Sequence, residues 1–326
     1  MNAKRNLIQI CLLCAAMLPA ATGLIALAIF GLVQSAGAQQ YGDYDYTYNG
    51  DGTITITGYT GSGGAISIPA MINGTNVTSI GYGAFNEINN NFNELTSVVI
   101  PNSITSIGGE AFDSCEIMTN VIIGTNVTSI GTNAFYACAM TSVIIPDSVT
   151  SIGDYAFYSC DSLTNITIPT NVTNIGVGAF AYCVNLATIT VDAQNSFYSS
   201  TNGVLFNKNQ TTLVQFPENQ GVSYTIPNGV TSIGDDAFYP CTSLTNVIIP
   251  NSITSIGDSA FGSCFSLTSV IIPNGVTNIG VFAFGGCGLT NIIIPNGVTS
   301  IPYRAFFDCT HLTRAYLINR ACNFCG

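Results

Sequence analysis

The chain has 326 residues, and charged side chains make up only 7% of it, against about 25% in a typical soluble domain. Its apolar fraction of 47% is enough to build a core, which argues against disorder, while Asn, Ser, Thr and Gly take the place of the missing charges. The formal net charge is −11 with only six Lys and Arg residues, so no basic patch can form and a nucleic-acid partner is excluded.

The N-terminal segment, residues 1–38, has the pattern of a signal peptide. Lys4 and Arg5 precede a long apolar stretch, and Ser35 to Ala38 then form a small-x-small cleavage site. We expect cleavage after Ala38, which would remove two positive charges and leave a net charge of −13. The stretch is also long enough to span a bilayer, so an uncleaved anchor is the alternative, and it would be the chain's only contact with a membrane. Both alternatives predict an exported chain.

Residues 39–64 are predicted to form a hairpin that caps the N-terminal end of the fold. Alternation from Tyr44 to Tyr48 and from Thr53 to Thr57 indicates two strands, and the Asn-Gly-Asp-Gly run from Asn49 to Gly52 indicates the turn between them. Such a hairpin would cover a sheet edge that is otherwise open.

Residues 65–317 contain nine repeat units. They share the pattern I-P-x-x-V-T-x-I-G-x-x-A-F-x-x-C-x-x-L-T-x-V-x. Six of the eight gaps between their Phe residues are 22 or 23 residues long. A fixed period of this length indicates one supersecondary unit per repeat, and such a unit is stable only when it is stacked on its neighbours. The Phe residues that mark the units are Phe85, Phe112, Phe135, Phe157, Phe180, Phe238, Phe261, Phe284 and Phe306.

Each repeat is predicted to hold two short extended segments and one turn. In Leu244 to Pro250, β-branched residues favour a short parallel strand with Val247 and Ile249 inward, and the Pro ends it. Ile253 to Gly257 is a second extended segment, closed by a Gly for which we predict a positive φ. Asp258 to Cys264 suits one helical or 3-10 turn. The predicted fold class is a β-rich repeat solenoid, a superhelix with short parallel strands and one helical or 3-10 turn per repeat.

One insert interrupts the period. The gap between Phe180 and Phe238 is 58 residues, and the extra residues lie at about 192–223. Within them, Gly203 to Asn207 and Leu213 to Pro217 indicate a hairpin or an irregular rung, where a rung is one turn of the solenoid. The regular repeat resumes after the insert, so we do not expect a domain boundary there.

Residues 318–326 form a C-terminal tail that departs from the repeat. The tail carries Cys322 and Cys325, a lone C-x-x-C motif. A disulfide, a metal bound in another molecule and redox exchange are all open for this pair.

The repeat resembles the BspA-like class of leucine-rich repeats, which is found on bacterial surface proteins. The similarity lies in the part of the pattern that runs from the Ile-Pro pair to the Leu after the Cys. The resemblance extends from about Ile66 to Leu317 and is specific, because the pattern recurs nine times. It implies a right-handed solenoid and a role in adhesion or in host and community interaction. It brings no catalytic residue with it.

Eight of the twelve cysteines hold the same repeat position, and we predict that they form a buried column of free thiols. The first repeat has Ile88 there, so the position accepts a plain apolar side chain. Stacked residues would keep their Cβ atoms about 4.8 Å apart, beyond the usual spacing for a disulfide. A metal column is the alternative, but each rung would offer one thiol and no His, whereas a zinc site needs several converging ligands. The eight are Cys115, Cys138, Cys160, Cys183, Cys241, Cys264, Cys287 and Cys309.

The sequence shows no constellation of residues for catalysis, so we expect no enzyme and no cofactor. The only histidine, His311, lies beside Cys309 at a position that should face solvent, and no third group is in place to orient it. Carboxylates recur after the repeat Gly, and we interpret them as solvated turn residues, with weak cation binding as the alternative. They are Glu110, Asp154, Asp235, Asp236 and Asp258.

The outward position of the first extended segment is the main candidate for a ligand site. An aliphatic residue occupies it in most repeats, between columns of Thr, Ser and Asn. A contiguous exposed apolar patch tends to mark an interaction surface, although β-branched residues also stabilise neighbouring strands without any ligand. The predicted ligand-binding residues are Val99, Ile122, Ile144, Ile248, Ile271, Ile293 and Tyr316, with Thr167 and Thr190 in the remaining rungs.

A ladder of hydroxyls is a second candidate surface. All nine repeats have Thr after the first apolar residue of the second extended segment, from Thr78 to Thr299. Such a ladder could order water, as in ice-binding solenoids, or it could be structural.

Taken together, these patterns predict an exported binding solenoid, secreted or held at the cell surface, that recognises an extracellular protein or glycan. A structural cell-envelope component without a specific ligand is the main alternative. The first interpretation predicts a saturable partner, and the second predicts self-association through the ends or edges of the solenoid. The patterns name neither the ligand nor the oligomeric state.

Overall fold

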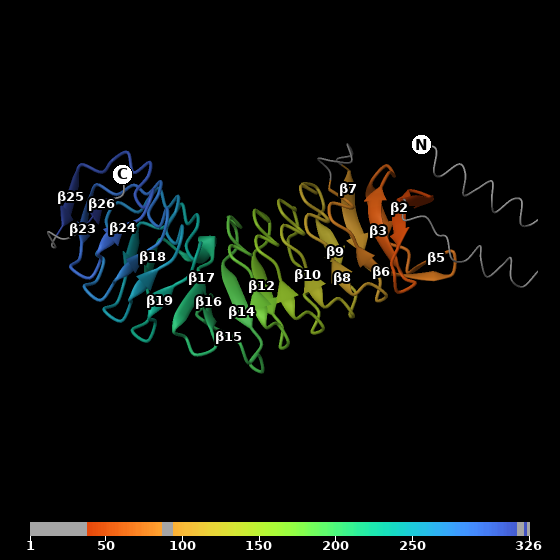
Figure 1. Ribbon diagram of the computed structural model, residues 1–326, viewed down its shortest axis with the longest axis horizontal. Helices are drawn as coiled ribbons and strands as arrows, with labels where there is room; N and C mark the ends of the chain where they lie inside the picture. Colours follow the sequence, from red (N-terminus) through yellow and green to blue (C-terminus); the bar gives the residue numbers. More distant parts are fainter. Residues whose placement is uncertain (1–37, 87–93, 318–322, 325–326) are drawn as a thin grey trace, which may run out of the picture. The chain divides into compact units, whose positions relative to one another are not determined.

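The computed structural model of the protein describes residues 38–86, 94–317 and 323–324. The segment interpreted as a signal peptide, up to residue 37, lies outside these residues, as do Ile88, the Asn-rich residues after it, and Cys322 with Cys325. Within the described residues, no helix is long and apolar enough to cross a membrane. The described strands stack as the successive rungs of a β-solenoid (Figure 1).

An antiparallel sheet covers the N-terminal end of the solenoid. β2 pairs with β1 and with β3, and β3 pairs in parallel with β6, where the regular ladder begins. Alternation along β2 and β3 buries Tyr46, Ile54 and Ile56, so apolar side chains close the edge of the first rung. The strands of this end are β1 (Gln39–Tyr41), β2 (Tyr44–Tyr48), β3 (Ile54–Tyr59), β5 (Met71–Ile72) and β6 (Thr75–Ile80).

The second extended segment of each repeat forms one side of the solenoid, as a parallel ladder of very short strands. These strands pair in register, as Ser129 does with Ser151 and Ile130 with Ile152, and the Ile points into the core. Before the insert the strands are β8 (Ser106–Ile107), β10 (Ser129–Ile130), β11 (Ser151–Ile152) and β13 (Asn174–Ile175). From the last strand of the insert onward they are β17 (Thr212–Gln215), β19 (Ser232–Ile233), β21 (Ser255–Ile256), β22 (Asn278–Ile279) and β24 (Ser300–Ile301), which pairs with β26 (Asn323–Phe324).

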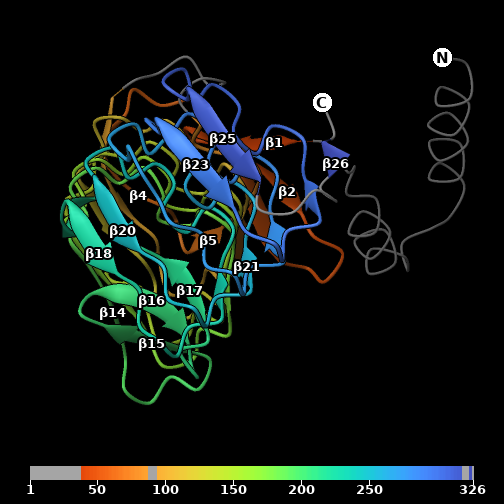
Figure 2. The same ribbon diagram turned by 90° about the vertical axis from the view of Figure 1, so that its left-hand side faces the viewer.

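The first extended segment forms a second side, which we call the sheet face. Its strands also pair in parallel and in register, and Figure 2 shows β18 beside β20 and β23 beside β25. The rungs that carry Ile144 and Ile271 form no strand here. The strands are β4 (Gly64–Ser67), β7 (Leu95–Val99), β9 (Asn120–Ile122), β12 (Asn165–Ile168), β14 (Thr188–Val191), β18 (Ser223–Thr225), β20 (Asn246–Ile248), β23 (Asn291–Ile294) and β25 (Arg314–Leu317).

The third side, which we call the turn side, carries the repeated Phe. The predicted helical or 3-10 turn consists of successive i→i+3 turns, as in the bond from the Tyr136 N–H to the Asn133 carbonyl. These turns do not extend into a helix, because the residues two before and two after the Phe have positive φ, as in Tyr155 and Ser159, both at 55°. Neighbouring Phe rings stack with centroids 4.7 to 5.7 Å apart.

The Gly that ends the second extended segment has a different role from the one predicted. We expected a positive φ at positions such as Gly257, but in the repeats the positive φ lies two residues later, at Ser259. A Cβ on Gly257 would lie 2.7 Å from the backbone N of Asp235, and one on Gly280 would lie 2.4 Å from the backbone N of Asp258. The Gly is required because successive rungs approach each other too closely here for any side chain.

The eight repeat cysteines are free and buried, which confirms the predicted thiol column. Each S–H donates to the carbonyl oxygen of the Phe in the preceding rung, with S···O distances from 3.0 to 4.0 Å. Cys therefore supplies a weak donor that Ile or Val at the same position lacks. Burial raises the pKa of the Cys138 and Cys241 thiols well above the usual range, and that of Cys309 to about 11.

The insert builds a substitute rung. β15 (Tyr198–Thr201), β16 (Val204–Asn207) and β17 pair antiparallel in turn, and β17 then joins the parallel ladder beside β19. Phe216 stacks on Phe238 at 5.0 Å and so starts a second run of Phe rings. The buried residues divide into two apolar cores at this point, one up to Leu205 and one that begins at Val204.

Candidate functional site

All seven predicted ligand-binding residues lie exposed on the sheet face. For six of them the neighbours along the chain point inward, as in β7, where Val98 is buried and Val99 is exposed, whereas the whole of β25 around Tyr316 is exposed. The exposed fraction reaches 84% at Ile144 and 80% at Ile271, which is unusual for Ile. The seven residues are Val99 (38%), Ile122 (54%), Ile144 (84%), Ile248 (53%), Ile271 (80%), Ile293 (46%) and Tyr316 (51%).

These residues form two patches and not one stripe. Val99 pairs with Ile122, and Ile293 with Tyr316, while Ile144 and Ile271 lie in rungs that form no strand on this side. Between the patches lie Thr167 and Thr190, whose hydroxyls are 2.8 Å apart, and then the insert. The first patch comprises Val99, Ile122 and Ile144, and the second comprises Ile248, Ile271, Ile293 and Tyr316. A hollow of about 400 Å³ adjoins the first patch, lined by residues that include Ile144 and Pro146.

The Thr ladder on the adjoining side is engaged with the backbone. The hydroxyl of Thr128 donates to the carbonyl of Thr105 at 3.0 Å, and that of Thr254 donates to the carbonyl of Thr231 at 3.2 Å. The same bond recurs from Thr105 to Thr277. The hydroxyls thus tie each rung to the one before it, as the structural interpretation of this ladder requires.

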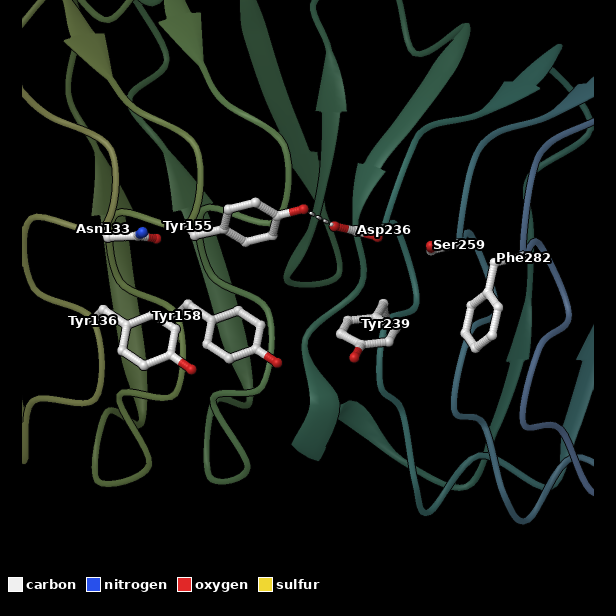
Figure 3. A pocket seen from close by; sticks show the side chains of 8 residues that line it. All are labelled: Asn133, Tyr136, Tyr155, Tyr158, Asp236, Tyr239, Ser259 and Phe282. Carbon is white, nitrogen blue, oxygen red and sulfur yellow. Dashed lines mark hydrogen bonds between the residues drawn. The ribbon is translucent and has the colours of Figure 1, made fainter. Parts of the chain in front are cut away.

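A further site, which the sequence patterns did not indicate, lies on the turn side where the insert joins the regular repeats. It is an open hollow of about 450 Å³, which we call the tyrosine pocket. Figure 3 shows that its side chains come from rungs on both sides of the insert. Its lining consists of Asn133, Tyr136, Tyr155, Tyr158, Asp236, Tyr239, Ser259 and Phe282.

The hollow exists because one rung has small side chains at two repeat positions of the turn side where its neighbours have larger ones. One column holds the residue two before each Phe, and the other holds the residue directly after it. The Phe157 rung carries Tyr155 and Tyr158 in these columns and the Phe238 rung carries Asp236 and Tyr239, but the Phe180 rung carries only Gly178 and Ala181. A Cβ on Gly178 would lie 2.5 Å from the Tyr155 ring and 3.1 Å from the Asp236 carboxylate. This Gly therefore leaves the space in which Tyr155 extends along the solenoid.

Tyr155 bridges the two parts of the solenoid at this pocket. Its hydroxyl donates to Oδ2 of Asp236 at 3.0 Å, across 81 residues of sequence (Figure 3). The Asp236 side chain is buried, with 6% of its surface exposed. Burial first, and then the charges of Asp235 and Asp258, raise its pKa to about 6. Burial and the Asp236 charge raise the pKa of Tyr155 to about 12, so it remains a neutral donor.

This result corrects the prediction for one of the repeated carboxylates. We interpreted Asp236 as a solvated turn residue, but the Tyr155 ring and the neighbouring rungs cover it. Asp154, Asp235 and Asp258 do lie exposed, as expected. Each accepts a hydrogen bond from a backbone N–H of the next rung, for example Asp235 from Asp258 at 2.7 Å. His311 is exposed as well, beside the hydroxyl of Thr310.

Ring stacking holds the floor of the pocket in place. Tyr136 and Tyr158 stack at 5.0 Å with an interplanar angle of 7°, and Tyr182 stacks on the other side of Tyr158 at 5.6 Å. Tyr155 meets Tyr158 edge to face at 5.7 Å. Burial, and the nearby phenol of Tyr239, raise the pKa of Tyr158 far above its usual value. Burial also raises the pKa of Tyr136, so the stacked phenols of Tyr136 and Tyr158 are neutral at physiological pH. The recurrence of Tyr directly after the repeat Phe, at Tyr136, Tyr158 and Tyr239, is the sequence signal that could have indicated this site.

Comparison with known proteins places these features in a family. The chain matches a family model described as BspA type Leucine rich repeat region, over residues 78–211 and 214–321. It is 30% identical to a leucine rich cell surface protein from Faecalibacterium prausnitzii, over 87% of this chain and 96% of that one, with a TM-score of 0.54. It is 29% identical to a leucine-rich repeat protein from Eubacterium ventriosum, over 86% and 78% of the two chains, with a TM-score of 0.62.

The pneumococcal vaccine antigen PcpA shares the fold, with 21% identity over 87% of this chain and 88% of that one and a TM-score of 0.62. No curated protein matches this chain.

Proposed function

This chain belongs to the BspA-type leucine-rich repeat family, and from that premise we propose that it is an exported cell-surface protein that binds an extracellular partner through its sheet face. A surface location is supported by the relative from Faecalibacterium prausnitzii, which is described as a cell surface protein. The apolar N-terminal segment, which lies outside the described residues, is consistent with export. The proposed role is recognition and not catalysis.

The exposure of the two aliphatic patches is the observation that carries this proposal. Ile144 and Ile271 keep 84% and 80% of their surface in water, although the strand periodicity would allow Thr at the same position, as it does at Thr167 and Thr190. Exposed aliphatic side chains gain free energy only when another surface covers them, at about 25 cal/mol per Å² of apolar area. A contiguous patch of this kind is typical of an interaction surface.

The chemistry of the patches favours a protein partner over a glycan. Branched aliphatic side chains complement apolar protein surface, whereas sugar recognition depends on hydrogen-bonding groups and exposed aromatic faces. Among the seven patch residues only Tyr316 carries a ring. We therefore expect the partner to be an extracellular protein that brings apolar side chains to the sheet face.

A binding experiment with two matched triple variants tests this proposal. The purified chain is applied to immobilised extracellular proteins and glycans, and saturable binding is measured. Ile248, Ile271 and Ile293 are then replaced by Ser, which should abolish the binding while the circular-dichroism melt stays near that of the wild type. The control replaces exposed apolar residues that lie off the sheet face, Val177, Phe265 and Val281, and it should bind as the wild type does.

The main alternative, a structural envelope component, predicts a different result. In that case no saturable partner appears, and the purified chain forms concentration-dependent oligomers in sizing experiments. Unchanged partner binding by the Ile248, Ile271 and Ile293 triple variant would reject the sheet face as the ligand site.

A further inference from the structure

The tyrosine pocket presents acceptor oxygens. They are the carboxylate of Asp236, the phenol oxygens of Tyr158 and Tyr239, the hydroxyl of Ser259 and the side-chain oxygen of Asn133. Figure 3 shows the phenol oxygens of Tyr158 and Tyr239 near each other, on the side of the pocket opposite the Tyr155–Asp236 hydrogen bond. None of the described residues that line it is Lys, Arg or His. The lining thus offers many acceptors and no positive charge.

The electrostatic environment of the pocket is negative. Asp236 has a pKa of about 6 and is therefore mostly ionised at neutral pH, although its side chain is buried. The charged neighbours that act on it are acidic as well, namely Asp235 and Asp258. Its described hydrogen-bond donor, Tyr155, is a neutral phenol. A buried carboxylate without a cationic partner is costly, and a positively charged ligand would lower that cost.

We propose that the tyrosine pocket binds a primary ammonium group, with the Asp236 carboxylate as its counter-ion. A primary ammonium carries three N–H donors and one positive charge, which matches the oxygens and the negative charge of the lining. This site is separate from the proposed sheet-face function, because it lies on the turn side.

Other ligand classes fit the pocket less well. An anion would face Asp236 and its acidic neighbours. A neutral sugar would need free ring faces, but the faces of Tyr158 are covered by Tyr136 and Tyr182. A quaternary ammonium has no N–H and so cannot use the acceptor oxygens.

Titration with matched small molecules tests the proposal. The full chain is titrated with n-butylammonium chloride and with 1-butanol, its neutral analogue, in a calorimeter. Because the chain has no Trp, tyrosine fluorescence provides a second signal that includes the pocket residues. We expect saturable binding of n-butylammonium that weakens as NaCl is raised, and no binding of 1-butanol. Tetramethylammonium should bind more weakly than n-butylammonium.

A second arm distinguishes two sources of the ammonium group. N-acetyl-lysine methylamide represents a lysine side chain of a protein, and n-butylammonium represents a free small amine. Tighter binding of the lysine derivative would assign the pocket to a protein-borne lysine, and binding of n-butylammonium alone would assign it to a small amine. Both results agree with the proposal.

Two variants assign the binding to the pocket. Asp236→Asn keeps the size of the side chain and an acceptor for Tyr155 but removes the charge, so it should weaken n-butylammonium binding about tenfold or more. The control is Asp147→Asn, which removes an exposed carboxylate far from the pocket and should bind as the wild type does.

Three results would overturn the proposal. They are equal binding of n-butylammonium and 1-butanol, unchanged binding in a folded Asp236→Asn chain, and no binding of either amine at about 10 mM. The salt dependence of the wild type tests the charge even if the variant fails to fold.

Discussion

The hydroxyl of Tyr155 donates a 3.0 Å hydrogen bond to Asp236, a residue 81 positions later in the chain. The bond joins the repeats before the insert to those after it, on the turn side of the solenoid. Elsewhere on this side, backbone hydrogen bonds connect each rung to the next one, as from the Tyr155 N–H to the Val177 carbonyl. The Tyr155–Asp236 bond therefore adds a side-chain connection across the irregular rung, where the Phe stack is divided.

Replacing Asp236 with Asn should change how stability depends on pH. Folding raises the pKa of Asp236 from 3.8 to about 6, so the folded state favours the protonated carboxyl. Its stabilising contribution is complete below about pH 4 and is lost as the pH rises through 6. At pH 7 the Asn variant should be more stable than the wild type by on the order of 1 kcal/mol, since residual hydration weakens the full linkage value.

Urea unfolding of both chains at pH 4, 5, 6 and 7 measures this difference. Other carboxylates with raised pKa values, such as Glu218 and Asp113, act equally in both chains and cancel in the comparison. A stability difference that stays constant over this pH range would contradict the assignment of the titration to Asp236.

Replacing Gly178 with Ala should break the bridge from Tyr155. The added Cβ would lie 2.5 Å from the Tyr155 ring, at a residue whose φ is +59°. The positive φ alone costs about 1 kcal/mol for Ala, and the displaced ring would lose its hydrogen bond to Asp236. We expect a total loss of about 2 kcal/mol in the free energy of unfolding.

The matched control is Gly229→Ala. Gly229 has no heavy atom within 4 Å of an added Cβ and is not among the residues with positive φ, so its stability should change by less than about 0.5 kcal/mol. Similar losses in the two variants would show that steric contact with Tyr155 does not matter.

The eight thiols of the repeat column should resist alkylation in the folded chain. They are buried and each donates to a backbone carbonyl, and burial raises the pKa of Cys183 and Cys264. Since the thiolate is the reactive form, native labelling by iodoacetamide should be negligible at these positions and rapid in denaturant. Mass spectrometry of the digested chain measures labelling at each position. Fast native labelling of Cys160 or Cys264 would refute a closed column.

The Thr ladder should have no effect on ice growth. The hydroxyls from Thr105 to Thr277 donate their protons to backbone carbonyls of the preceding rung, so each is fixed by the solenoid itself. We expect no thermal hysteresis from the purified chain. A clear hysteresis gap that disappears when Thr128 and Thr150 are replaced by Val would establish the opposite.

The repeat pattern determined the fold to a large extent. In a solenoid each rung contacts mainly the rungs before and after it, so a side chain at one position meets the same position about 23 residues away. From that rule alone the sequence predicts the inward Val and Ile, the Phe column, the thiol column and the outward position of Ile248 and Ile271, and the structure confirms each of these placements. The repeat Gly shows the limit of the rule, because Gly permits both a positive φ and close backbone approach, and only packing distinguishes them.

Only the tertiary structure decided what happens at the insert. Its length is not a multiple of the period, so counting along the chain does not place Tyr155 near Asp236, nor Tyr158 near Tyr239. The pairing of β15, β16 and β17 sets how many rungs separate the two halves, and that pairing depends on contacts that occur once in the chain. Small side chains at Gly178 and Ala181 then leave the space that Tyr155 crosses. Periodic contacts can be derived from one repeat, whereas a contact formed once depends on the path of the whole chain between its two residues.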